Sequence, residues 1–336
     1  MRTPRIVRAG PAALAALAAL AVAAGADDSS AALGAGGIVF TKNTPVRMAA
    51  EDLAISPQAV RIRFEFQNPT RKDVDTIVAF PLPDIDTSEF WGSAIGTVKD
   101  DAKNFVGFKA VVDGKPVPFT VEQRAFVKNK DVTAIVLAAG APINPVTDEG
   151  YDKLSKLPRD KQKALIAAGA ADGDGLNEFV PQWTVRTKFY WPQKFPAGKT
   201  VVIEHSYQPV TGQFFFSTQY QKRTDQNNAG FCFDPGIWAS LDARTAKTKQ
   251  PGSEDAGTYM NGYETDYILK TAANWQGPIG RFHLTLDKLK ADNILTLCWD
   301  GDLKKTGPAT FEFTAQNFAP ARDVHMLVLE TAAPIE

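Results

Sequence analysis

Three histidines occur in this 336-residue sequence, and histidine is the side chain best suited to proton transfer or metal binding near neutral pH. His205 shares one face of an alternating stretch with Val201 and Ile203, so it is predicted to point toward a protein interior. We select it as the candidate histidine for a binding or catalytic site. No nucleophile or second ligand is spaced with it along the chain, so a partly buried structural histidine is the simpler interpretation.

The other two histidines are predicted to be structural. His283 lies on the opposite side of its strand from Phe282 and Leu284, which places it toward solvent, and His325 lies in the apolar stretch VHMLVL, which predicts burial. The sequence contains no His-x-x-x-His, Gly-x-Ser-x-Gly or phosphate-loop motif, so it does not favour a zinc hydrolase, an ester hydrolase or a nucleotide-binding protein. We therefore predict no catalytic residue and no cofactor.

Two pairs of carboxylates could in principle bind a cation or divide acid and base roles. Asp84 and Asp86 follow a proline-terminated strand in a polar loop, where solvated acids are the usual outcome. Asp172 and Asp174 lie in the segment ADGDGLNEF, but Leu176 stands where a helix-loop-helix calcium site needs an oxygen ligand. The sequence thus predicts no metal site, although weak binding near Asp172 and Asp174 stays open.

Two tryptophan-bearing segments are the remaining candidates for ligand contact. AANWQGPIG contains Asn274 and Trp275 ahead of a Gly-Pro pair, and FCFDPGIW ends in Trp238. Because loops on a rigid scaffold often carry binding residues, these three residues join His205 as candidate binding residues. The alternative is a turn fixed by Gly-Pro and a tucked tryptophan, which is the simpler interpretation.

The N-terminal segment has the pattern of a cleaved secretory signal peptide. Three arginines precede an alanine-rich run that ends in the small residues Ala24-Gly25-Ala26. We expect cleavage before Asp27 and export to the periplasm or the cell exterior, with no transmembrane segment in the mature chain. Residues 27–336 carry a formal charge of −4, which does not favour nucleic acid as a partner.

Cys232 and Cys298 are the two cysteines of the sequence. Export would place them in an oxidising compartment, where paired thiols persist, so a structural disulfide is predicted. Two buried free thiols are the alternative. A redox-active pair is disfavoured because the residues are far apart and lack a Cys-x-x-Cys setting.

Alternating apolar residues predict a mainly β chain. Residues 60–67 alternate between apolar and polar side chains, and Asp113-Gly114 lies between two alternating runs, as in a hairpin. Pro81 and Pro83 are predicted to stop sheet pairing, since proline cannot donate to a ladder. Residues 148–170 instead have helical spacing.

These patterns predict two antiparallel β-sandwich-like domains with a short helical insertion between them. The N-terminal domain is expected at 27–145, the insertion and its loop at 146–180, and the C-terminal β domain at 181–336.

The sequence also resembles known families. The segments VRIRFEFQNPT, DVDTIVAFPLPD and FVGFKAVVDGKPV, within residues 55–125, resemble the vault and inter-alpha-trypsin domain, which implies a β-sandwich. The segments IVAFPLPDID, FYWPQKFPAGKTVVIEHSYQPVTG and YILKTAANWQGPIGRFHLTLDK resemble the exported bacterial family catalogued as domain of unknown function 4424. That resemblance covers nearly all of the mature chain and implies export without implying an activity.

The function expected from these observations is a non-catalytic periplasmic or cell-envelope protein that binds a small ligand or a partner protein. One alternative is an envelope hydrolase, which requires a carboxylate or hydroxyl within reach of His205 in an open pocket. Another is an adhesion or assembly module, which requires a broad exposed apolar patch or an unpaired strand edge.

Overall fold

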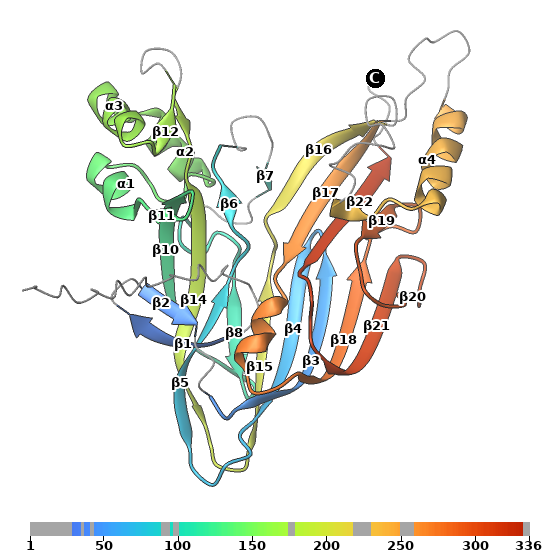
Figure 1. The fold of residues 1–336 in the computed structure, drawn as a ribbon. Helices are drawn as coiled ribbons and strands as arrows, with labels where there is room; N and C mark the ends of the chain where they lie inside the picture. Colours follow the sequence, from blue (N-terminus) through green and yellow to red (C-terminus); the bar gives the residue numbers. More distant parts are fainter. Residues whose placement is uncertain are drawn as a thin grey trace, which may run out of the picture.

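The structure is a computed structural model that describes residues 29–34, 37–40, 44–88, 95–96, 101–173, 179–217, 230–248 and 259–331. The predicted signal peptide and its cleavage site before Asp27 lie outside these residues. The described chain is mainly β, as the sequence predicts, and Figure 1 shows the three larger sheets side by side.

Three antiparallel-rich sheets and one short ribbon make up the β structure. The first sheet has seven strands: β11 (Lys130–Asp131), β10 (Thr120–Val127), β14 (Thr184–Phe195), β5 (Val74–Pro81), β1 (Ser29–Gly34) and β2 (Gly37–Phe40), with β6 (Ile85–Asp86) also on β14. The second has eight: β20 (Lys304–Lys305), β21 (Thr310–Phe318), β18 (Ile279–Asp287), β3 (Arg47–Ser56), β4 (Ala59–Gln67), β15 (Thr200–Tyr207), β8 (Lys109–Val112) and β9 (Lys115–Pro116). The third has five: β19 (Ile294–Leu297), β22 (Val324–Thr331), β17 (Tyr259–Tyr267), β16 (Thr211–Ser217) and β7 (Ile95–Gly96). The ribbon pairs β12 (Ala171–Asp172) with β13 (Val180–Pro181).

Strands from both sides of the helical insertion share the same sheets. β5 pairs with β14 in the first sheet, β4 pairs with β15 in the second, and β3 runs parallel to β18. The predicted boundary between 27–145 and 181–336 therefore does not separate two sheets. Pairing between strands that far apart in sequence leaves no local signal, which is why alternation alone could not reveal it.

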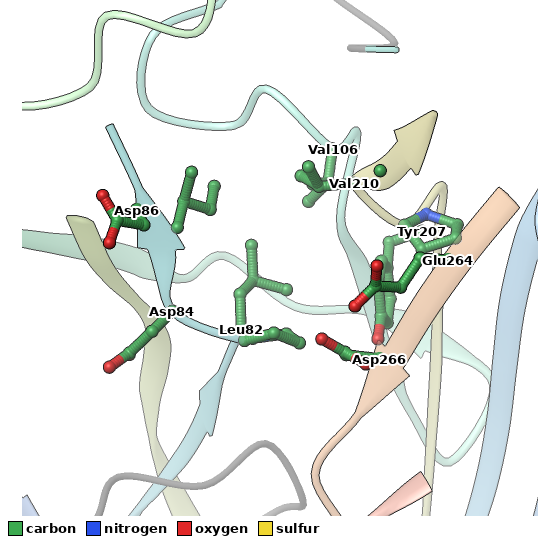
Figure 2. A pocket seen from close by; sticks show the side chains of 12 residues that line it. Leu82, Asp84, Asp86, Val106, Tyr207, Val210, Glu264 and Asp266 are labelled. Atoms are coloured by element: carbon green, nitrogen blue, oxygen red, sulfur yellow. The ribbon is translucent and has the colours of Figure 1, made fainter. Parts of the chain in front are cut away.

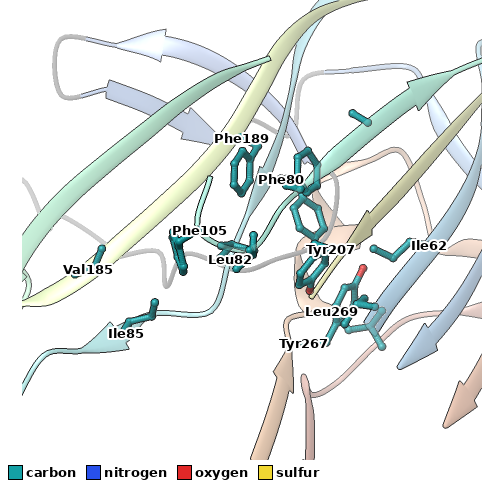
Figure 3. Packing of buried hydrophobic residues seen from close by; sticks show 14 of the residues in the cluster. Ile62, Phe80, Leu82, Ile85, Phe105, Val185, Phe189, Tyr207, Tyr267 and Leu269 are labelled. Carbon is teal, nitrogen blue, oxygen red and sulfur yellow. The ribbon is translucent and has the colours of Figure 1, made fainter. Parts of the chain in front are cut away.

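The main core lies between the first and second sheets. Along β4, the apolar side of the predicted alternation is buried, with Ile62 3% exposed and Phe64 fully buried. Figure 3 shows Phe80 and Phe189 of the first sheet entering the same space as Tyr207 of the second. Period-two alternation has therefore placed one face of each strand in this core, as expected.

The Phe-Pro-Leu-Pro segment separates two strands, β5 and β6, that both pair with β14. β5 ends at Pro81, the Leu82 N–H donates to the Thr187 carbonyl at 2.9 Å, and pairing with β14 resumes at β6. Proline at position 83 cannot donate to a ladder, so the chain between β5 and β6 leaves the sheet. This excursion, residues 82–84, forms part of the wall of the pocket described below.

Helical segments among the described residues accompany the sheets. They are α1 (Thr133–Ala139), α2 (Asp148–Ser155), α3 (Arg159–Ala167), α4 (Pro235–Thr248) and the 3₁₀ helix η3 (Lys270–Asn274). α2 and α3 lie in the predicted insertion, and the Thr147 hydroxyl accepts from the Gly150 N–H at 3.1 Å as the N-cap of α2. α1 lies inside the predicted N-terminal β domain, and α4 lies inside the predicted C-terminal β domain, where no helix was predicted. Within the described ranges, every helix is too short or too polar to cross a membrane.

The predicted disulfide between Cys232 and Cys298 is confirmed, with an S–S distance of 2.02 Å. It joins the segment before α4 to the chain that follows β19. A disulfide fits a protein from an oxidising, non-cytoplasmic compartment.

Candidate functional site

His205 lies deep in the core between the sheets. Its side chain is 3% exposed and is surrounded by aromatic rings, with centroid distances of 5.6 Å to Phe64, 5.0 Å to Phe80, 4.9 Å to Phe108 and 5.5 Å to Trp191. Burial lowers the pKa of His205 to about 3, so the imidazole is neutral at physiological pH. This enclosed aromatic setting argues against the open catalytic pocket that a hydrolase at His205 requires.

The predicted tryptophan candidates are also packed into the interior. Trp275 is 4% exposed and its ring lies 4.5 Å from that of Phe66, while Trp238 on α4 is 7% exposed and lies 5.2 Å from Phe233. Asn274 ends η3 and is buried as well. Their positions fit the simpler interpretation of tucked side chains better than direct contact with a ligand.

The carboxylates singled out from the sequence are held by neighbouring groups. Asp84 accepts a hydrogen bond from the Arg186 Nε at 2.9 Å, and the Asp86 Oδ1 accepts from the Ser88 hydroxyl at 2.7 Å. Asp172 accepts from the Gly173 N–H at 2.8 Å. Asp174, the other half of the calcium candidate, lies outside the described residues.

A pocket with a volume of about 140 Å³ opens where the first sheet meets the joint between the second and third sheets. We call it the junction pocket. It is lined by Leu82, Pro83, Asp84, Ile85, Asp86, Val106, Tyr207, Pro209, Val210, Gly212, Glu264 and Asp266. Figure 2 shows Asp84 and Asp86 on one side of this space and Tyr207, Glu264 and Asp266 on the other.

The junction pocket combines apolar and acidic groups. Leu82 and Ile85, from the segment that also carries Asp84 and Asp86, supply apolar surface together with Val106 and Val210. On the side of Glu264 and Asp266, the hydroxyl of Tyr207 is buried and has no hydrogen-bond partner within the described structure. Burial, together with the nearby charge of Asp266, raises the pKa of Tyr207, so this hydroxyl stays protonated and can donate.

Glu264 and Asp266 reach the pocket from the same face of β17, because residues two apart along a strand point the same way. His325 on β22 is the cross-strand partner of Asp266. Its Nδ1 is hydrogen-bonded to the Asp266 Oδ1, and its Nε2 lies 3.5 Å from the Glu264 Oε1. One side-chain donor atom from each of the three residues lies within 4.8 Å of the other two. We call these residues the carboxylate–histidine cluster.

The cluster corrects the prediction that His325 is buried, since its side chain is 36% exposed. Val324 and Met326 are buried on the opposite face of β22, and Leu327 and Leu329 are buried on the same face as His325. His325 differs from them because it faces the partly exposed Glu264 and Asp266. Partial burial alone would lower the pKa of His325. The hydrogen bond and charge of Asp266, with the charge of Glu264, outweigh burial and raise that pKa above its usual value.

The disulfide segment covers the ring of His325. Phe231, next to Cys232, stacks on the imidazole with a centroid distance of 4.2 Å and an interplanar angle of 15°. The Phe231 carbonyl in turn accepts a hydrogen bond from the Thr296 hydroxyl at 2.5 Å. The His325 ring therefore lies between the carboxylates of β17 and a segment that the disulfide fixes. No local sequence pattern indicates this restraint.

His283 provides a natural comparison, because it also lies between two carboxylates. Its Nε2 is 3.1 Å from the Glu312 Oε2 and its Nδ1 is 3.6 Å from the Asp52 Oδ1, on the partly exposed face predicted for it. Asp52, however, is already held by two hydrogen bonds from Arg281, at 2.6 and 2.8 Å. Those bonds, partly opposed by burial, lower the pKa of Asp52.

Comparisons with known proteins place this fold in a family. None of the curated proteins matches the chain. A solved structure of a Legionella pneumophila protein, provisionally named a nutrient-binding protein, shares 15% identity and gives a TM-score of 0.39, over 84% of this chain and 67% of that one. The resemblance to the vault and inter-alpha-trypsin domain is not confirmed. A family model matches residues 26–327, and the chain accordingly belongs to the family described as domain of unknown function 4424 (DUF4424).

Proposed function

We propose that this protein is an exported, non-catalytic binding protein of the periplasm or cell envelope. Its site is the junction pocket, and its ligand is a small molecule or ion that brings positive charge to Glu264 and Asp266. The observation that carries this proposal is a pocket in which apolar side chains, the carboxylates of Glu264 and Asp266 and a buried Tyr207 hydroxyl line one space.

The lining of the pocket offers both negative charge and apolar contact. Ligand sites in proteins are concave and largely apolar, with a few polar groups that fix orientation. Glu264 and Asp266 supply negative charge, and Leu82 and Ile85 can cover apolar atoms of the ligand. The Tyr207 hydroxyl would gain the hydrogen-bond partner that it lacks among the described residues, which lowers the free energy of the bound state.

Export is part of the same proposal. The signal-peptide pattern of residues 1–26 directs the chain to the oxidising side of the membrane, where the Cys232–Cys298 bridge is stable. We expect the mature protein to begin at Asp27.

The sheet edges make assembly by strand addition a weaker alternative. Four of the outermost strands, β11, β9, β20 and β7, have only two residues each. Short edge strands are a common way for β proteins to prevent pairing with other chains. The large hydrophobic side chains exposed in the described structure, Leu137, Tyr151 and Phe215, come from three separate elements or loops.

Native mass spectrometry tests the proposal. The mature protein would be isolated gently from its native envelope fraction, and its mass compared under native and denaturing conditions. We expect a retained small ligand or ion that is lost in Glu264→Gln, which removes a negative charge, and in Leu82→Asp, which places a charge on the apolar surface of the pocket. Asp172→Asn, at a residue outside the pocket lining, should keep it. A wild-type protein without any retained mass, under conditions where a panel of small cations also fails to shift Tm, would contradict the proposal.

A further inference from the structure

We propose that Glu264, Asp266 and His325 bind a divalent transition-metal ion of the zinc or nickel type at the acidic wall of the junction pocket. This inference rests on the proposed function, because it identifies the cation that the pocket receives. It goes further in assigning His325, which does not line the pocket, as a ligand.

The backbone positions the three donors without help from a loop. Glu264 and Asp266 are two residues apart on β17, so both carboxylates project from one face of the third sheet. His325 is directly opposite Asp266 on the neighbouring strand β22. Donors on two hydrogen-bonded strands are held more precisely than donors on loops, which favours a preorganised site.

The spacing of the donors is compatible with one ion. Ligands at about 2.0–2.2 Å from a tetrahedral zinc ion lie roughly 3.3–3.6 Å from one another. The three side-chain donors already lie within 4.8 Å of one another, and the His325 Nε2 is 3.5 Å from the Glu264 Oε1. Because Glu264 faces Nε2 and Asp266 faces Nδ1, an ion at one ring nitrogen requires the carboxylate on the other nitrogen to rotate toward it. Both carboxylate side chains are partly exposed, which leaves room for that rotation.

The mixture of donors favours a transition metal over an organic cation or calcium. An ammonium group is satisfied by carboxylates alone, and calcium prefers oxygen ligands. An imidazole nitrogen with two carboxylate oxygens instead suits zinc or nickel. Three protein ligands leave a further coordination position, which is typical of sites that also bind water or a small molecule.

Two further observations point to a ligand at this place. The Tyr207 hydroxyl, on a side chain that is 5% exposed, lines the same pocket without a described hydrogen-bond partner, and the charge of Asp266 acts on it. Phe231 stacks on the His325 ring at 4.2 Å and restrains its orientation.

The contrast with His283 makes the assignment specific. Asp52 beside His283 accepts two hydrogen bonds from Arg281 and lies 3.9 Å from Arg63. A metal ion there would have to displace a guanidinium and would be repelled by its charge. Glu264 and Asp266 have the imidazole of His325 within ion-pair distance, and that imidazole can itself become a ligand.

Isothermal titration calorimetry on untagged, chelator-treated mature protein tests the proposal directly. Zinc, nickel, manganese, calcium and magnesium chlorides would be titrated into the wild type and into His325→Gln, Glu264→Gln and His283→Gln. We expect one equivalent of zinc or nickel to bind the wild type, and at least about tenfold weaker binding in the first two variants. His283→Gln should bind as the wild type does. Circular dichroism and Tm of each metal-free variant show whether it has kept the fold, and Asp266→Asn replaces any variant that has not.

Each outcome decides a separate question. Wild-type protein that does not bind any of the transition metals, or His325→Gln that binds as tightly as the wild type, overturns the metal site. If no transition metal binds, but chelator-treated wild type still retains a small molecule that Leu82→Asp loses, the proposed binding function stands and only the metal site is wrong. If metal binds but neither the wild type nor Leu82→Asp retains a small molecule, the pocket is a metal site alone.

Discussion

Two histidines on neighbouring sheets show how differently the same side chain is used in this molecule. His205 points into the core between the first and second sheets, is 3% exposed and lies among aromatic rings. His325 in the third sheet is 36% exposed and lies between two carboxylates. Burial therefore holds the first neutral, while neighbouring charge favours protonation of the second.

The groups that face a histidine indicate its role better than the side of the strand on which it lies. Both residues belong to strands with apolar neighbours, and sequence alternation places His205 correctly in an interior. An enclosed interior cannot admit a ligand, whereas the carboxylates beside His325 come from β17, a strand that is distant from β22 in sequence.

Removal of the disulfide should have the largest effect on stability and should act on the surroundings of His325. Cys232→Ala with Cys298→Ala opens a loop with a sequence separation of 66, and should lower the free energy of unfolding by about 4 kcal/mol in the entropic description. The segment that carries Phe231 should also loosen over His325, while the aromatic core around His205 stays packed. Urea unfolding and amide hydrogen exchange measure the two effects. Equal loss of protection around both histidines would contradict this distinction.

Truncating the two histidines should separate packing from surface charge. His205→Ala leaves a cavity among Phe64, Phe80 and Phe108, and we expect a loss of about 3 kcal/mol in the free energy of unfolding. His325→Ala removes a partly exposed ion pair and should cost less than about 1 kcal/mol in metal-free protein. Chemical denaturation at pH 7 gives both values, and the reverse order would refute the structural role assigned to His205.

Glu51 extends the comparison to a carboxyl group in the interior. It is fully buried, its Oε2 lacks a hydrogen-bond partner in the described structure, and burial raises its pKa to about 8. Since that pKa exceeds the ordinary value of 4.5, the wild type loses stability as pH rises from about 4.5 toward 8. Glu51→Gln removes this penalty, so it should be more stable than the wild type at pH 8 by up to about 4 kcal/mol. At pH 4 the advantage should disappear, and thermal unfolding at the two pH values provides the check.

The neutral state of His205 predicts an effect on stability at acid pH. Its folded pKa of about 3 lies below the unfolded value of 6.5, so the contribution to stability is complete above 6.5 and is lost as pH falls toward 3. The expected slope is up to about 1.4 kcal/mol per pH unit in that window. His205→Met, of similar bulk and without a titrating group, should have a shallower acid dependence. An unchanged slope between pH 6 and 4 would mean that His205 does not remain neutral in the folded protein.

Features encoded locally could be predicted from the sequence. Alternation located β4, and Asp113-Gly114 forms the expected turn, with φ angles of 47° and 77°. Export chemistry suggested the disulfide. The sequence also contains a start signal for helix α4, because Asp234 precedes Pro235. The Asp234 Oδ1 accepts from the Ile237 N–H at 2.8 Å, as N-cap residues do.

The site depends on contacts that the sequence does not bring together. The junction pocket needs the segment after β5, the joint after β15 and the face of β17 that carries Glu264 and Asp266, which only the sheet pairing unites. The apolar neighbours along β22 predict burial of His325, whereas the position of Glu264 and Asp266 on the neighbouring strand is a property of register. Asp84 and Asp86 do line the pocket, although their hydrogen bonds to Arg186 and Ser88 show them engaged elsewhere.

The most direct test of the central claim is a zinc titration followed by the imidazole ¹⁵N resonances of all three histidines in chelator-treated mature protein. We expect the ¹⁵N resonances of the His325 ring to shift and to saturate at one equivalent of zinc. The His205 resonances should remain those of a neutral, enclosed ring, and the His283 resonances should change little. A His325 signal that zinc leaves unmoved, or a saturating shift at His205 or His283 instead, would contradict that claim.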